Sequence, residues 1–131
     1  MAFLEFLPIT TGTLAGTMMQ VRPWQREFLE SVDGLAEGVS RPVRTAVLSM
    51  PRKQGKTAIA AGLALCHLSG PEAEQRGQVY SAANDRAQAA LICNEIAAMI
   101  SRVSFLDERI SLRRLRSGCR HCRHVGRAWP G

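Results

Sequence analysis

Residues 49–57 of the chain read Ser-Met-Pro-Arg-Lys-Gln-Gly-Lys-Thr and lie between two apolar runs. The run before them, Arg44 to Met50, has the length and the β-favouring composition of a buried strand. The run after them, Thr57 to Leu68, consists mainly of Ala, Ile, Leu and other small residues, which is typical of a helix packed against a sheet. A strand that gives way to a helix across a Gly-Lys-Thr turn predicts a phosphate-binding loop.

The residue types of this turn suit the chemistry of a phosphate group. Backbone N–H groups and the positive end of the following helix can surround phosphate oxygens. Lys56 is expected to reach the β and γ oxygens, Thr57 to ligate Mg²⁺ through its hydroxyl, and Gly55 to let the backbone approach closely. The common pattern has glycine five residues before Gly55, where this chain has Met50. The tripeptide alone is a weak signal, but its context and the lack of acids in the turn favour a phosphate site over a plain surface turn.

Further elements on both sides of the turn predict an α/β fold. A short helix is expected from Pro23 to the stop signal at Asp33-Gly34. Residues 78–82 form a second strand candidate, and Asn84 is placed to cap a helix from Asp85 to about Val103. The order strand, loop, helix, strand, helix is a βαβ unit with parallel strands, with the phosphate turn at the carboxyl end of the first strand.

Charge is distributed unevenly along the 131 residues. The formal net charge is +6, but every acid lies at or before Glu108, and only arginines contribute charge after it. The positive balance therefore belongs to the end of the sequence rather than to the predicted α/β part. No stretch has the length of a membrane span, and Cys66 and Cys93 lie in apolar helical segments where reduced thiols are expected.

The turn also resembles a known motif. Residues 50–57 are similar to the deviant Walker A motif of phage terminase large subunits, which often read Pro-Arg-Lys-x-Gly-Lys-Ser/Thr and lack the first glycine. In that family the arginine of the turn acts on the γ-phosphate, which implies a catalytic role for Arg52 beside Lys56. Pro51, Lys53 and Gln54 belong to the same implied pocket. The alternative for Arg52 and Lys53 is a solvated basic pair.

Two more segments resemble the same family in the same order. Pro23-Trp24-Gln25 is similar to its adenine-recognition element, in which a glutamine amide reads the adenine edge and an aromatic ring covers the base. The alternative is that Trp24 is core and Gln25 exposed. Residues 79–89 are similar to the strand-to-helix segment that follows in terminases, although an ordinary capped helix start also explains them.

The resemblance, which covers about residues 20–108, implies a partial P-loop NTPase fold, incomplete at the C-terminus. It divides the chain into an irregular lead-in (1–20), the N-terminal part of an ATPase domain (21–110) and a basic, disordered or non-native tail (111–131). It implies ATP and Mg²⁺ as cofactors and double-stranded DNA, the terminase small subunit and the portal as partners, in the cytoplasm of a bacterial host. The Walker B acids and the nuclease domain are not found in the sequence, so a truncated chain that binds ATP with little hydrolysis is expected.

Two other functions remain open from the sequence. A helicase-like P-loop ATPase also has a glutamine element before Gly-Lys-Thr, although the Pro-Arg-Lys turn favours the terminase. A non-enzymatic basic protein would bind nucleic acid through its arginine tail. The tail also carries Cys119, His121, Cys122 and His124, which are zinc ligand types, but their spacing is cramped for a tetrahedral site and favours chance composition.

Overall fold

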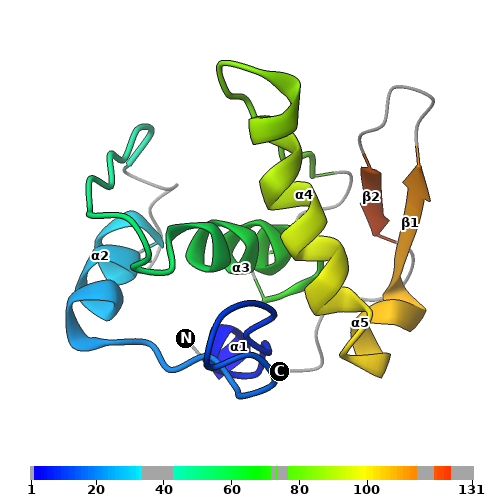
Figure 1. Ribbon diagram of the computed structural model, residues 1–131, viewed down its shortest axis with the longest axis horizontal. Helices are drawn as coiled ribbons and strands as arrows, with labels where there is room; N and C mark the ends of the chain where they lie inside the picture. Colours follow the sequence, from blue (N-terminus) through cyan, green and yellow to red (C-terminus); the bar gives the residue numbers. More distant parts are fainter. Residues whose placement is uncertain (1, 34–42, 72, 74–76, 115–119, 125–131) are drawn as a thin grey trace.

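The computed structural model describes residues 2–33, 43–71, 73, 77–114 and 120–124 of the chain. Five helices and two strands are formed by these residues (Figure 1). The helices are α1 (Ala2–Glu5), α2 (Pro23–Asp33), α3 (Lys56–Ser69), α4 (Arg86–Ile100) and α5 (Ser104–Arg109). The strands are β1 (Ile110–Arg114) and β2 (Arg120–His124).

Helices α3 and α4 cross at the centre of the molecule (Figure 1) and supply half of its buried apolar cluster. Leu65, Met99 and Ile100 are fully buried between them and their neighbours. Gly62 lets α1 approach α3, because a Cβ at this position would lie 2.8 Å from Cδ2 of Leu4. The buried apolar cluster comprises Phe3, Leu4, Leu7, Met19, Leu29, Ile59, Ala61, Ala64, Leu65, Cys66, Ile96, Met99, Ile100, Val103, Leu106 and Ile110.

The first 20 residues, for which the sequence predicts no element, pack against this core. They form α1 and a narrow loop in which the Ile9 N–H donates to the Thr17 carbonyl at 2.8 Å. The side chain of Arg102 donates to the carbonyl of Ile9 at 3.1 Å, and the buried Thr10 hydroxyl donates to the carboxylate of Glu95 on α4. The segment is therefore attached to α3 by apolar packing, and to α4 and the turn after it by polar contacts.

The three predicted helices are confirmed as α2, α3 and α4, with one correction at a cap. The residue that caps α4 is Asp85 rather than Asn84, since the Asp85 carboxylate accepts from the Gln88 N–H at 2.8 Å. The chain turns at Ser101 instead of continuing as one helix to Val103, which directly precedes α5. Cys66 is buried and Cys93 is half-buried.

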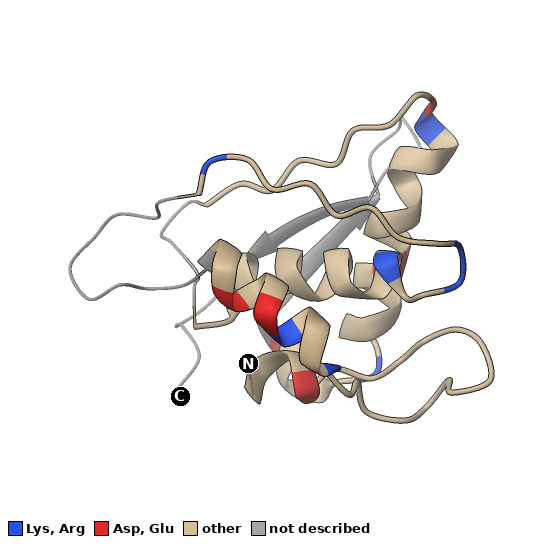
Figure 2. Ribbon diagram, turned by 90° about the vertical axis from the view of Figure 1, so that its left-hand side faces the viewer, with Lys and Arg blue, Asp and Glu red and all other residues tan. Residues whose placement is uncertain are grey.

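The predicted parallel strands at 44–50 and 78–82 are not formed among the described residues, so the structure does not show the predicted parallel sheet. Both segments are extended, and Figure 2 shows them running in the same direction towards the starts of α3 and α4. Val47 and Tyr80 are 85% and 84% exposed, whereas a strand inside a parallel sheet is covered on both faces. A strand exists only where a neighbour accepts and donates its backbone hydrogen bonds, and residues 43–50 and 77–83 have the direction of parallel strands without that pairing.

The two strands of the described residues lie instead in the basic segment after Glu108. β1 and β2 form an antiparallel hairpin in which Ile110 is opposite His124 and Arg114 is opposite Arg120. β2 contacts α4 and α3, and β1 follows α5 directly. The helices of the described residues are all too short or too polar to cross a lipid bilayer.

Candidate nucleotide-binding site

The phosphate turn lies on the surface between the extended segment 43–50 and α3. All residues from 51 to 57 are exposed. Lys53 has φ 65° and Gly55 has φ 78°, so two residues of the turn adopt the left-handed conformation. These two reversals bring the chain round to α3, which begins at Lys56. Glycine adopts this conformation without strain, which explains why the sequence has glycine directly before the helix.

The N-terminus of α3 is open towards solvent. Gly55 is its N-cap residue, and no side chain caps the helix there. The first N–H groups of a helix have no partner within the helix and carry a partial positive charge. Over the 14 residues of α3 the peptide dipoles are aligned towards this end. The turn therefore presents donors of the kind that bind a phosphate group.

Lys56 closes the turn on itself. Its Nζ donates to the carbonyl oxygen of Met50 at 2.7 Å, six residues back along the chain. The ammonium group thus lies across the residues that the phosphate would approach, on an exposed side chain that is able to move. The sequence analysis did not predict this partner, because every residue has a backbone carbonyl and the residue types do not show which one accepts a hydrogen bond.

The remaining residues predicted for the turn lie where the sequence analysis expects them. Pro51, Arg52 and Gln54 are exposed on the turn, and Thr57 follows Lys56 in the first turn of α3. The hydroxyl of Thr57 is thus placed at the open end of the helix. Among the residues whose surroundings the structure describes, no group of three His, Cys, Asp or Glu side chains forms a metal cluster.

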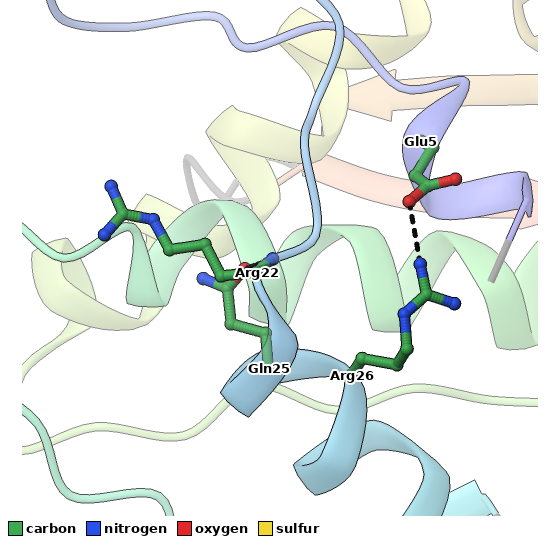
Figure 3. Close-up of polar contacts among 4 residues, drawn as sticks. All are labelled: Glu5, Arg22, Gln25 and Arg26. Carbon is green, nitrogen blue, oxygen red and sulfur yellow. Dashed lines mark hydrogen bonds and ion pairs between the residues drawn. The ribbon is translucent and has the colours of Figure 1, made fainter.

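The predicted adenine element lies at the start of α2. Gln25 is 9% exposed, and its Oε1 accepts from the backbone N–H of Arg22 at 2.8 Å, as Figure 3 shows. This is half of a capping box, in which the third residue of a helix satisfies the N–H of its N-cap residue. Trp24 is 39% exposed. The alternative from the sequence, a buried Trp24 beside an exposed Gln25, is therefore wrong, because Trp24 is the exposed residue and Gln25 the buried one.

Helix α2 lies at the end of α3 at which the turn enters (Figure 1). Arg26 of α2 also pairs with Glu5 of α1 at 3.1 Å, drawn in Figure 3. Both side chains are 44% exposed, so this ion pair contributes little to stability. The pair joins α2 to the N-terminal segment on the same side of the molecule as the turn.

The structure does not place either the paired acids or the candidate metal ligands of the basic segment beside the phosphate turn. Asp107 and Glu108 are consecutive exposed acids, but they lie on α5 rather than at the end of a strand. Cys119 lies outside the described residues, and the structure does not describe the side chains of Cys122 and His124 on β2. The candidate metal ligands of the basic segment are therefore identified from the sequence alone.

An exposed glycine-lysine turn at the open N-terminus of a helix is typical of a P-loop, and the match to a solved terminase structure supports an α/β NTPase-like fold. Comparison with known proteins gives the family. The model of the family described as "Terminase large subunit, ATPase domain" matches residues 23–120, so the chain belongs to the terminase large-subunit ATPase family. The terminase large subunit of Enterobacteria phage HK97 is 40% identical over 101 residues, which are 76% of this chain and 19% of that protein.

A solved structure agrees with the sequence comparison. The crystal structure of the HK97 bacteriophage large terminase superposes with a TM-score of 0.74 at 31% identity, over 99% of this chain and 28% of that one. The matched parts of the chain thus span 19% and 28% of the lengths of these relatives. The family match also continues to residue 120, beyond the 20–108 range that the motifs of the sequence suggest.

Proposed function

We propose that this chain binds ATP and Mg²⁺ at residues 51–57, as the nucleotide-binding part of an ATP-driven motor that packages viral DNA. The observation that carries the proposal is the open start of α3 at Gly55, beside an exposed Lys56 whose ammonium donates to a backbone carbonyl. An incoming triphosphate would replace the Met50 carbonyl as the partner of the ammonium. A charge-assisted hydrogen bond to phosphate is stronger than one to a neutral carbonyl.

Each residue of the site has a distinct proposed role. Lys56 binds the β and γ oxygens, and Arg52 neutralises charge that develops at the γ-phosphate. Thr57 ligates Mg²⁺. Pro51, Lys53, Gln54 and Gly55 shape the turn and supply backbone donors, while Trp24 and Gln25 contact the adenine.

The partners follow from the family rather than from contacts of this chain. We propose that it acts on double-stranded DNA together with a terminase small subunit and a portal, in the cytoplasm of a bacterial host. The helicase-like alternative has the same chemistry at the turn, and the family match does not favour it.

Binding of a fluorescent ATP analogue to the 131-residue chain tests the proposal. Lys56→Ala is expected to weaken binding about ten- to hundred-fold, the equivalent of about 1.5–3 kcal/mol for hydrogen bonds to a charged group. Arg86→Ala removes a positive charge from an exposed position outside the turn and serves as the matched control. Equal affinity of wild type and Lys56→Ala would refute the proposed site.

The magnesium role of Thr57 has its own test. Removing Mg²⁺ with a chelator is expected to weaken ATP binding by the wild type. Thr57→Ala should bind ATP with little dependence on Mg²⁺, whereas Thr57→Ser keeps the hydroxyl and should keep the dependence. A Thr57→Ala variant with the full magnesium effect would assign the metal to other ligands.

We expect the chain on its own to bind ATP but to hydrolyse it slowly. Phosphoryl transfer to water needs an acidic group that holds Mg²⁺ and orients the attacking water. The consecutive acids of the described residues, Asp107 and Glu108, lie on α5. Phosphate release measured at saturating ATP should therefore be close to background. Rapid release that is lost in Lys56→Ala would contradict this expectation.

A further inference from the structure

The N-terminal segment of the protein, residues 2–20, is attached to α4 and to the turn that follows this helix. The buried Thr10 hydroxyl donates to the carboxylate of Glu95 on α4. The guanidinium of Arg102, in the turn after α4, donates to the carbonyl of Ile9 at 3.1 Å and to that of Thr10 at 3.5 Å. Side chains from a distant part of the sequence thus hold the middle of this segment in one place.

The same segment fixes the point at which α2 begins. The Met19 N–H donates to the Leu7 carbonyl at 2.8 Å, and Leu7 is fully buried. Leu7 packs at Gly62 of α3, where a Cβ would lie 3.4 Å from its Cδ1. Residues 20–22 alone separate Met19 from the first residue of α2. Since one residue of extended chain spans at most about 3.6 Å, α2 has to begin close to this attachment.

A side-chain contact also joins the N-terminal segment to the first turn of α2. Glu5 pairs with Arg26 at 3.1 Å, and Arg26 directly follows Gln25, whose Oε1 accepts from the Arg22 N–H (Figure 3). The turn of α2 that carries Trp24 and Gln25 is therefore connected to the N-terminal segment along the backbone and through an ion pair.

We propose that the N-terminal segment holds Trp24 and Gln25 in place for the adenine base, with Thr10 and Arg102 as positioning residues. The inference rests on the proposed function, whose nucleotide site it extends. Lys56 and the open N-terminus of α3 are not part of this route, because the phosphate turn enters α3 from the extended segment before it. Loosening the N-terminal segment should therefore weaken the contacts to the base and spare those to the triphosphate, since hydrogen bonds depend steeply on distance and angle.

Competition titrations against the fluorescent ATP analogue, with ATP and with inorganic tripolyphosphate at constant Mg²⁺, test the proposal. Tripolyphosphate has the phosphate chain of ATP without the base, so the ratio of the two dissociation constants measures what the adenine contributes. The wild type should bind ATP more tightly than tripolyphosphate. Thr10→Val should weaken ATP binding about three- to ten-fold and change tripolyphosphate binding by less than about two-fold.

Three further variants identify the cause of such a split. Thr10→Ser keeps the hydroxyl donor and should keep the wild-type ratio. Thr11→Val makes the same substitution at the neighbouring exposed position and should keep the ratio as well. Lys56→Ala should weaken both ligands, because both have the phosphate chain. Every variant is titrated at a temperature at which its circular dichroism is that of a fully folded protein.

Arg102→Gln tests the same route without disturbing a buried group. Arg102 is exposed, and the Ile9 carbonyl also accepts from the Gly16 N–H at 2.8 Å, so this variant should fold. Its ATP affinity should fall while its tripolyphosphate affinity is retained. Arg86→Gln, at an exposed position on α4, is the matched control and should leave both affinities unchanged. If Thr10→Val does not fold, Arg102→Gln decides the question.

The possible results separate this inference from the proposed function. Equal weakening of both ligands in Thr10→Val and Arg102→Gln would overturn the inference, because the segment would then support the fold as a whole. Unchanged binding of both ligands would overturn it too. A wild type that binds both ligands equally well would refute the adenine contact, and this inference with it, but not the phosphate site. A wild type that binds neither ligand would refute the proposed function itself and the inference that rests on it.

Discussion

The Nζ of Lys56 lies 2.7 Å from the carbonyl oxygen of Met50, so the phosphate turn is closed by its own lysine. Met50 stands where the common phosphate-loop pattern has glycine. Lys53 is the sole non-glycine residue with positive φ among those described, so Met50 does not need the conformational freedom of glycine. The contact uses a backbone atom that every residue has, which explains how the turn tolerates this departure from the pattern.

Replacement of Met50 should therefore change little. We expect Met50→Ala to bind the ATP analogue with an affinity within about two-fold of the wild type, because the carbonyl that holds Lys56 is retained. Titration of the fluorescent analogue measures this, with Lys56→Ala as the reference for a true loss. A large loss in Met50→Ala would mean that its side chain, not its carbonyl, shapes the turn.

Substitution of Gly55 should destabilise the protein because of its backbone conformation and not because of a steric clash. A Cβ at Gly55 would meet nothing within 4 Å, so any cost of Gly55→Ala comes from its φ of 78°. We expect a loss of about 1–2 kcal/mol in the free energy of unfolding, measured by urea denaturation. Gly55→Asn should lose less, since asparagine tolerates the left-handed region. Identical losses in the two variants would point to a cause other than backbone strain.

Gln25 offers a way to separate its structural role from its proposed adenine contact. Gln25→Ala loses the acceptor for the Arg22 N–H and should lower the free energy of unfolding by about 1 kcal/mol. Gln25→Glu keeps the acceptor, and the favourable position of its charge near the N-terminus of α2 offsets part of the cost of a carboxylate at this buried position, so it should be more stable than Gln25→Ala.

The same Gln25→Glu variant lacks the amide donor that we propose reads adenine. If Gln25 contacts the base, this variant should bind the ATP analogue more weakly than the wild type at a temperature at which both proteins are fully folded. Titrations of both variants, compared with their melting temperatures, measure the two roles independently. Undiminished ATP binding by Gln25→Glu would leave Gln25 with its helix-capping role alone.

The contact between the N-terminal segment and α4 should depend on a buried hydroxyl. Thr10 and Glu95 are 8% and 9% exposed, and the Thr10 hydroxyl donates to the Glu95 carboxylate. Thr10→Val keeps the shape but leaves the carboxylate without this donor, so we expect a loss of about 1–3 kcal/mol in the free energy of unfolding. Thr11→Val at the neighbouring exposed position is the matched control and should change stability little.

Sequence patterns predicted the elements whose signals are local. The helix that starts at Pro23, the apolar helix over residues 57–68 and the capped helix that starts at Asp85 are all read from neighbouring residues, and all three helices are present. The phosphate turn lies where the sequence puts it, exposed and directly before α3. The cap of α4 was misassigned by one residue, because Asn84 and Asp85 carry equally good acceptors.

Predictions that needed distant partners were not confirmed or were not made. The segments 44–50 and 78–82 have strand-forming residues, but among the described residues no neighbouring strand supplies their hydrogen bonds. Residues 1–20 show no periodicity, yet Phe3, Leu4 and Leu7 enter the core because Gly62 leaves room on α3. The sequence analysis did not predict the hairpin of β1 and β2. A run of arginines is typical of a solvated tail as long as the strand register is unknown.

The amino-acid sequence by itself determined the helices and the phosphate turn, and with them the family, since backbone propensity, caps and a glycine before a helix act over a few residues. The tertiary structure alone decided that Lys56 rests on the Met50 carbonyl, that Gln25 caps α2, and that Thr10 reaches Glu95 across 85 positions of sequence. Such contacts depend on which surfaces are buried together when the chain packs, and burial is a property of the whole fold rather than of any segment.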